Sequence, residues 1–327
     1  MASTSIATSH GLTSEQWESS LYQKAQENTF FGRFKGVGQG SMIQVKRDLV
    51  KKAGDALTFG FANSIRGTAG VTGNTPLEGE TSGTYTVNNE AMVFNNQRVV
   101  IDQLRQSIKI EGLLDEKRVA FNLRNEAKTQ LSDWYAYNED QALFTAINSC
   151  DTVLSTFISD AALTYDAIVD MKKEAMFPTD DNVGAGAKTR KLEPIRVENG
   201  EEVYILGVNP ADAAAFRKST DFKAFNQNAD VRGSKNAIYT GMLGMFNSVV
   251  IHEHSSFAAG LPVLMGANAA FLAYGKEIMY GEDTFDYKNQ TGFMVGSVRG
   301  VALAKHDDTT DNAAGSSYGA IKFVISA

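Results

Sequence analysis

Apolar residues recur at steps of three or four, or close to them, between Glu111 and Asn148, the spacing of one face of a helix. Neither Gly nor Pro interrupts the chain from Leu113 to Phe177. A helix from Glu111 to Ile147 would be roughly 55 Å long at ~1.5 Å per residue. A helix of that length needs another body packed along it, so we interpret it as a spine. Charged residues, Glu139 and Asp140 among them, are expected on its remaining surface. The predicted apolar stripe is Ala120, Leu123, Ala127, Leu131, Trp134 and Ala142.

Before the spine, the chain predicts a short helix, two strands and a polar arm. Thr13 is a typical N-cap, and the expected helix runs from it towards Phe31. Runs rich in Phe, Val and Ile predict strands at Leu57–Ala62 and Ala91–Leu104. Between them, Gly67–Asn89 is dominated by Gly, Thr, Ser, Asn and Glu. Strands on both sides of so long a polar segment favour an extended arm that packs on a neighbour.

After the spine, helices and strands remain segregated, which indicates an α+β fold. Thr164 starts a helix whose predicted inner face holds Ile168, Met171 and Ala175. Asn209 and Pro210 favour a helix start. The other expected elements are a strand at Val203–Val208, a helix at Ala211–Lys218, a strand at Ser248–Ile251, an apolar element at Pro262–Tyr274, and strands at Phe293–Lys305 and Tyr318–Ile325.

Composition narrows the class of protein. The chain has 327 residues, a length compatible with two domains, and a net charge of −7. That charge argues against generic affinity for nucleic acid, which needs a dense basic face. Cys150 is the only cysteine, which excludes an intrachain disulfide and favours synthesis in a reducing compartment. We expect neither a transmembrane helix nor a secretory signal.

The candidate chemistry is sparse. His252 and His254 would lie on the same face of a strand, half of a metal site, or at a solvated strand end. The segment Gly36–Gly40 has the wrong glycine spacing for a phosphate loop and is expected to be a turn. The acidic run from His306 to Asp311 lacks the spacing of an EF-hand and is expected to be a surface turn. We therefore expect no catalytic site, no metal site and no cofactor.

An ordered set of short segments resembles the coliphage N-four-like major capsid proteins over roughly residues 40 to 305. One departure is Ser248, where that family's pattern leads us to expect Gly. The segments that carry the resemblance are Ile43-Gln44-Val45, Asp48-Leu49, Lys51-Lys52-Ala53-Gly54-Asp55, Thr58-Phe59, Pro76-Leu77-Glu78-Gly79, Gln106-Ser107, Tyr204 to Pro210, Gly241, Gly244-Met245-Phe246-Asn247, Val249-Val250-Ile251-His252-Glu253, Leu264 to Ala269 and Tyr274-Gly275-Lys276.

The resemblance implies the tailed-phage coat fold of the Hong Kong 97 type. The expected parts are an N-terminal arm and first strand at 1–56, an extended loop (a β-hairpin arm) at 57–110, a peripheral domain with the spine helix at 111–159 plus 277–327, and an axial domain at 160–276. The last strands are expected to return to the peripheral sheet. The expected contacts between subunits are Pro76, Leu77, Glu78, Glu80 and Trp134.

The resemblance also implies the function: a major capsid protein that self-assembles as pentamers and hexamers into an icosahedral head. The expected location is the virion, after synthesis in the bacterial host cytoplasm. The implied partners are other copies of the chain and the scaffolding, portal and decoration proteins, with enclosed double-stranded DNA and no membrane. Three alternatives remain: an encapsulin-like compartment shell, a metal-assisted hydrolase that uses His252 and His254, and a minor capsid or tail component that would not form closed shells alone.

Overall fold

The computed structural model describes residues 29–38, 40–50, 54–62, 78–81, 84–87, 94–118, 122–151, 153–154, 162–176, 191–198, 200–220, 222, 244–308 and 313–325. The expected N-terminal helix, most of the polar stretch 67–89, Ala120, and Pro76 and Leu77 lie outside the described residues. Asp311, the last member of the acidic run after His306, lies outside them as well.

A long antiparallel hairpin forms the centre of an elongated body. It consists of β14 (Ala270–Phe285) and β15 (Gln290–Leu303), and β7 (Asp102–Ile110) pairs with the outer side of β15. On the other side, β2 (Ile43–Lys46) pairs in parallel with β14 and with the short β1 (Lys35–Gly36). This long sheet therefore has the order β1-β2-β14-β15-β7.

The expected single spine helix is two helices. The first, α2, spans Leu113–Arg118, and the second, α3, spans the 26 residues Leu123–Asn148, about 39 Å at ~1.5 Å per residue. Asn122 divides them with an extended backbone, and its side chain accepts hydrogen bonds from the backbone N–H groups of Arg124 and Asn125. A residue in this N-cap conformation starts a helix, so the prediction of one continuous helix from Glu111 was wrong.

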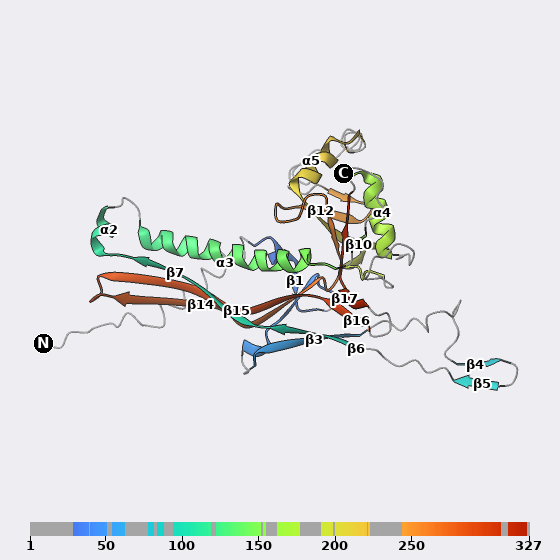
Figure 1. Cartoon of the computed structure of the whole chain (residues 1–327), viewed down its shortest axis with the longest axis horizontal. Helices are drawn as coiled ribbons and strands as arrows, with labels where there is room; N and C mark the ends of the chain where they lie inside the picture. The colour runs from blue at the N-terminus through green and yellow to red at the C-terminus, as the bar shows by residue number, and fades with distance from the viewer. Residues whose placement is uncertain are drawn as a thin grey trace.

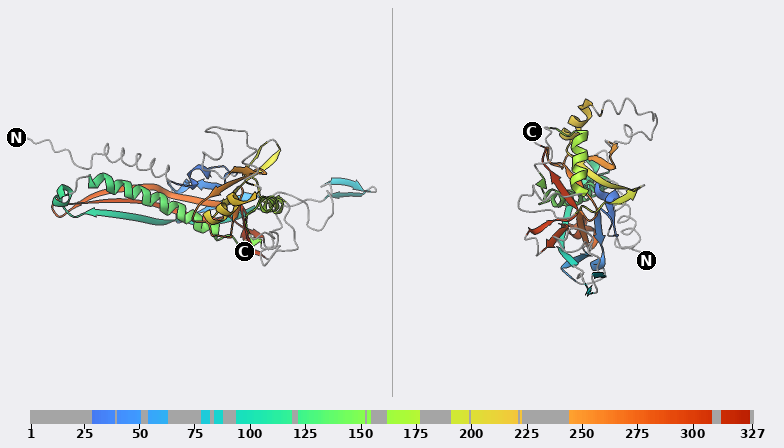
Figure 2. Two further views of the ribbon diagram at one scale, coloured as in Figure 1. Left: turned by 90° about the horizontal axis from the view of Figure 1, so that it is seen from above. Right: turned by 90° about the vertical axis from the view of Figure 1, so that its right-hand side faces the viewer.

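The face that α3 buries also differs from the prediction. Ala127 and Leu131 are buried as expected, but Trp134 and Ala142 are only partly buried. Glu139 and Asp140, which we expected on the surface, are buried with 2% and 7% of their surface exposed. Two views show α3 lying along the long sheet over β7, β14 and β15 (Figures 1 and 2). The buried residues of α3 are Ala127, Leu131, Ser132, Tyr135, Ala136, Glu139, Asp140, Leu143, Phe144 and Ile147.

A second lobe stands at one end of the long sheet (Figure 1). Its sheet has the order β11-β12-β10-β13-β18-β8, with β9 paired to β10. The strands are β8 (Val153–Leu154), β9 (Arg196–Glu198), β10 (Glu201–Val208), β11 (Gly244–Phe246), β12 (Val249–Glu253), β13 (Val263–Met265) and β18 (Ala320–Phe323). Its helices are α4 (Tyr165–Met176) and α5 (Pro210–Lys218).

Several predictions for the second lobe are confirmed. Ile168, Met171 and Ala175 of α4 are fully buried. Asn209 caps α5 by accepting from the N–H of Ala211, with Pro210 in the first turn. The apolar periodicity of α4 and the Asn209 cap of α5 depend only on residues close in the sequence, so the sequence alone predicts both helices.

Two expectations about the later strands were wrong. The last strand, β18, pairs with β13 and β8 in the second lobe, and does not return to the long sheet. The border expected between residues 276 and 277 falls inside β14, which continues from Ala270 to Phe285. The apolar stretch from Pro262 to Tyr274 is the point where the chain leaves one sheet and enters the other, through β13 and β14.

The turn at Ser248 keeps a backbone conformation that favours glycine. Asn247 and Ser248 have φ angles of 48° and 60°, between the antiparallel strands β11 and β12. Two successive residues with positive φ are typical of a tight hairpin turn, for which Asn-Gly is the preferred pair. The replacement of the expected Gly by Ser248 therefore leaves the turn intact.

The remaining strands form separate pairs. β3 (Ala56–Ala62) pairs with β6 (Phe94–Val100), and β4 (Glu78–Thr81) pairs with β5 (Thr84–Val87). The predicted strand Ala91–Leu104 is thus divided between β6 and β7. β16 (Lys305–Asp308), the start of the acidic run, pairs with β17 (Ala313–Ser317). Two short 3-10 helices, η1 (Phe31–Phe34) and η2 (Asp48–Val50), complete the described elements, and a turn between Gly38 and Ser41 precedes β2 as predicted.

One apolar core joins the long sheet, α3 and the second lobe. It contains Phe31 from η1, Ile43 from β2, Phe144 from α3 and Met265 from β13, all at most 1% exposed. Because these residues come from both sheets and the helix between them, the two lobes share a packed interior.

Candidate functional site

The segment Thr29–Gly36, which we call the arm root, is tied to consecutive residues of α3. The backbone N–H groups of Phe30 and Phe31 donate to the two oxygens of the Asp140 carboxylate, at 2.6 and 3.2 Å. The Lys35 ammonium forms an ion pair with the Glu139 carboxylate. Two acidic residues of the helix thus hold the place where the N-terminal part of the chain joins the body.

Glu139 is also the centre of a buried charge network. Its Oε2 accepts from the Tyr274 hydroxyl at 2.8 Å and from Nη1 of Arg299 at 3.0 Å. Nη2 of Arg299 donates to Oδ1 of Asn138 at 2.6 Å. The side chains of Glu139 and Arg299 are 3% and 2% exposed. Lys35, Tyr274 and Arg299 lie 104 to 160 residues from Glu139 in the sequence, so the network joins η1–β1, β14 and β15 to α3.

The charges in this region balance. Glu139 and Asp140 supply two negative charges, and Lys35 and Arg299 supply two positive charges. Burial alone would raise the pKa of Glu139, but Lys35 and Arg299 lower it below its ordinary value. Burial raises the pKa of Asp140, although the N–H groups of Phe30 and Phe31 oppose this rise. Burial and the Glu139 charge also raise the pKa of Tyr274.

His252 and His254 belong to an aromatic cluster around the arm root. The His254 ring stacks on Phe144 with 4.3 Å between centroids, and Phe30 lies 4.9 Å from His254. The His252 ring packs edge-on to Phe34 at 5.2 Å. Burial lowers the pKa of both histidines, and for His254 the Asp140 charge opposes this shift. His252 lies within β12 and His254 directly follows its last residue, and both side chains are partly buried, so this strand end is less solvated than we expected.

A metal site at these histidines finds no support in the geometry. Within the described ranges, no group of three or more His, Cys, Asp and Glu side chains is arranged to hold a metal ion. His254 Nδ1 accepts from the backbone N–H of Ser256 at 3.2 Å, and Gln141 donates to the Ser256 hydroxyl at 2.9 Å. Ser256 is therefore hydrogen-bonded to α3 through its hydroxyl, and its contact with His254 is made by the backbone N–H and not by a nucleophile–base pair.

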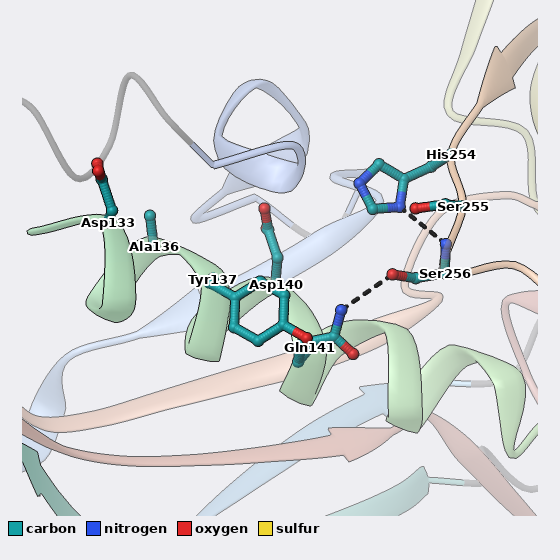
Figure 3. Close-up of a pocket in the computed structure, with 8 residues that line it drawn as sticks. All are labelled: Asp133, Ala136, Tyr137, Asp140, Gln141, His254, Ser255 and Ser256. Atoms are coloured by element: carbon teal, nitrogen blue, oxygen red, sulfur yellow. Dashed lines mark hydrogen bonds between the residues drawn. The ribbon is translucent and has the colours of Figure 1, made fainter. Parts of the chain in front are cut away.

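An open pocket of 420 Å³ lies beside the arm root, between α3 and the loop after β12 (Figure 3). Asp140 forms its inner wall, and the Tyr137 side chain at its rim is 65% exposed. The pocket combines carboxylates, hydroxyls and one exposed aromatic ring. Its lining residues are Asp133, Ala136, Tyr137, Asp140, Gln141, His254, Ser255 and Ser256.

The residues predicted to contact other subunits have scattered positions. Glu78 and Glu80 lie on β4, opposite Val87 and Tyr85 of β5. Trp134 packs against the apolar cluster between α3 and the long sheet, which contains Ile110 and Leu131. The sequence analysis did not predict the buried contacts of Glu139 and Asp140. Acidic residues on a helix are most often exposed to solvent, and the partners of these two lie more than 100 residues away in the sequence.

Among the described helices, we found none with the length and apolar character needed to span a membrane.

Comparisons with known proteins agree on one class. The family model described as "Phage capsid protein" matches residues 5–156 and 149–262. The major capsid protein of Pseudomonas phage KPP25 is 23% identical over 97% of this chain and 96% of its own length. The capsid of Ralstonia phage GP4 has a TM-score of 0.67 and 22% identity, and covers 90% of both chains. The capsid of Helicobacter pylori bacteriophage KHP30 has a TM-score of 0.71 and 16% identity, over 90% of this chain and 91% of its own.

Glu139→Gln tests the buried network. The substitution keeps the shape of the side chain but leaves Lys35 and Arg299 with one counter-charge fewer, so we expect a loss of about 3–5 kcal/mol in the free energy of unfolding at pH 7. Because the pKa of Glu139 is lowered in the folded protein, its contribution is present above the ordinary value of 4.5 and is lost as the pH falls below it. The gap in melting temperature between wild type and variant should therefore narrow below about pH 4.5.

Melting curves from pH 3 to 8 measure this gap. Glu126→Gln is the matched control, because Glu126 lies on the same helix and is exposed. A Glu139→Gln variant as stable as wild type at pH 7 would show that the Glu139 charge does not stabilise the fold. A difference in melting temperature that stays constant down to pH 3 would show the same.

Proposed function

This chain belongs to the phage capsid protein family, and we propose that it is the major capsid protein whose copies build the icosahedral head of a tailed bacteriophage. The observation that carries the proposal is the match of the elongated fold, over 90% of this chain, to solved phage capsids. The family also favours this function over the encapsulin-like shell and over the hydrolase. The proposed location is the virion.

The shape and interior of the subunit support assembly as its function. A closed lattice multiplies many modest contacts, so each subunit must present its surfaces in fixed relative positions. The shared apolar core and the Glu139 network hold the long sheet, α3 and the second lobe together. A stiff, elongated body of this kind offers long edges to its neighbours (Figures 1 and 2).

The division into parts is a proposal that strand pairing supports after several changes. The arm (1–56) and a peripheral domain with α3 remain as the sequence suggested. The extended loop expected at 57–110 ends before β7, which pairs with β15 of the long sheet, and β8, expected in the peripheral domain, pairs with β18 of the second lobe. We assign the whole of β14 to the peripheral domain, so the axial domain, which began at 160, ends before Ala270. We assign β18 to the axial domain because it pairs with β13. The N-four-like subtype is also part of this proposal.

The proposed contacts and partners follow from the resemblance. Pro76, Leu77, Glu78 and Glu80 of the extended loop would contact a neighbouring copy, and Trp134, which is partly buried, would contribute less. The copies would form pentamers and hexamers with the help of scaffolding, portal and decoration proteins.

The net charge of −7 would limit the adhesion of enclosed double-stranded DNA to the inner wall. We propose a structural role without catalysis or cofactor, after synthesis in the cytoplasm of the bacterial host.

Expression of the chain alone tests the function. We expect light scattering to report a mass far above that of the 35.4 kDa subunit, and negative-stain microscopy of the same fraction to show shells, tubes or rings of five and six. A species that stays monomeric or dimeric up to high concentration, both alone and when co-expressed with the scaffolding protein of its phage, would contradict the proposal.

Deletion of residues 70–83 tests the extended loop. We expect the variant to remain folded, because the two strands that flank the loop, β3 and β6, pair with each other outside the deleted segment. It should fail to close shells, since an arm that reaches a neighbour would be missing. Circular dichroism checks the fold and microscopy checks the particles. Normal particles from the folded deletion variant would refute the role of the loop.

A further inference from the structure

We propose that the tip of the β14–β15 hairpin inserts Tyr287 into a groove between β7 and α3 of a second copy of this chain. The inference rests on the proposed function, in which many copies associate, and adds a specific contact to it. The tip comprises Asp286, Tyr287, Lys288 and Asn289. The groove has a volume of 280 Å³.

The tip presents an aromatic side chain in a defined conformation. Tyr287 is fully exposed, with 103% of its reference surface accessible, and Phe285 beside it is 47% exposed. Asp286, Tyr287 and Lys288 have φ angles of 50°, 53° and 73°, which are uncommon for residues other than glycine. The Asn289 N–H donates to the Asp286 carbonyl at 2.9 Å and closes the turn. Backbone strain of this kind is retained most often where it serves a contact.

The groove has an apolar floor of suitable size. Ile108, Ile110, Leu123 and Ala127 line it. Ile110 and Ala127 are buried, whereas Ile108 and Leu123 are partly exposed. The groove is open to solvent, and its volume is sufficient for a phenol ring. The complete exposure of Tyr287 shows that the ring does not occupy the groove of its own chain.

The tip and the groove each carry charges of both signs. Asp286 and Lys288 flank Tyr287 on the tip. Lys109, Glu111 and Glu126 line the groove, so both charges of the tip have an opposite charge available there. With Tyr287 inserted, Lys288 is placed to meet one of these carboxylates at the rim. An aromatic anchor flanked by a rim ion pair is the usual composition of a protein interface.

The tip and the groove lie at the same end of the elongated body. The side chain of Asn289 lies 3.5 Å from the position that a Cβ on Gly112 would take, just after β7. The Lys109 ammonium lies 5.7 Å from the centre of the Phe285 ring. Because the tip and the groove are different surfaces, their contact is heterologous and can close into a ring. In such a ring each copy inserts its tip into one neighbour and receives the tip of another.

A photoreactive benzoylphenylalanine at position 287 tests the contact in particles of the full chain. We expect cross-links that mass spectrometry maps to residues 108–127 of another copy. Tyr287→Ala should raise the subunit concentration needed for assembly by roughly tenfold or more. Lys288→Glu should weaken assembly, and the double variant Lys288→Glu with Glu126→Lys should restore it. Tyr165→Ala, an exposed tyrosine in the second lobe, is the control and should assemble normally.

The outcomes separate this inference from the proposed function. Particles that form without cross-links to residues 108–127, or that assemble equally well with Tyr287→Ala, would overturn the tip contact and leave the capsid function intact. A wild-type chain that forms no particles even when co-expressed with the scaffolding protein of its phage would contradict the capsid function itself.

Discussion

The buried carboxylate of Glu139 is the constraint on which the arrangement of the subunit depends. It lies on α3 and accepts contacts from Lys35, Tyr274 and Arg299, which come from three other elements. A buried ion network of this kind contributes little when compared with an apolar core of equal volume, but the loss of one member is costly because it leaves a charge without compensation. The contacts of the network tie the arm root and the β14–β15 hairpin to the helix.

This constraint connects the fold to the function. A capsid subunit must hold its arms and edges in one geometry, because a small angular error repeated around a shell prevents closure. In this chain, Asp140 fixes the start of η1 and Glu139 fixes β1, so two adjacent residues of α3 set where the arm root leaves the body. The aromatic cluster of Phe30, Phe144 and His254 covers the same junction.

The sequence predicted those parts of the structure whose signals are local. α4, β10 and α5 carry clear apolar periodicity or a cap at Asn209, and each was placed within a few residues. The break at Asn122 was missed because the helix boundary depends on one cap inside a stretch without Gly or Pro. The burial of Glu139 was missed because its partners are brought close only by the tertiary fold. The pairing of β18 with β13 is a long-range choice of the same kind. The capsid fold itself came from an ordered set of short resemblances and not from any single residue.

Hydrogen exchange at the arm root tests the central claim most directly, with mass spectrometry following the peptide that contains Phe30 and Phe31. If the Asp140 carboxylate holds these two amides, Asp140→Ala should speed their exchange by at least about tenfold. Glu126→Ala, at an exposed acidic residue near the other end of the same helix, should leave the exchange unchanged. Equal exchange in wild type and Asp140→Ala would show that the spine helix does not hold the arm root.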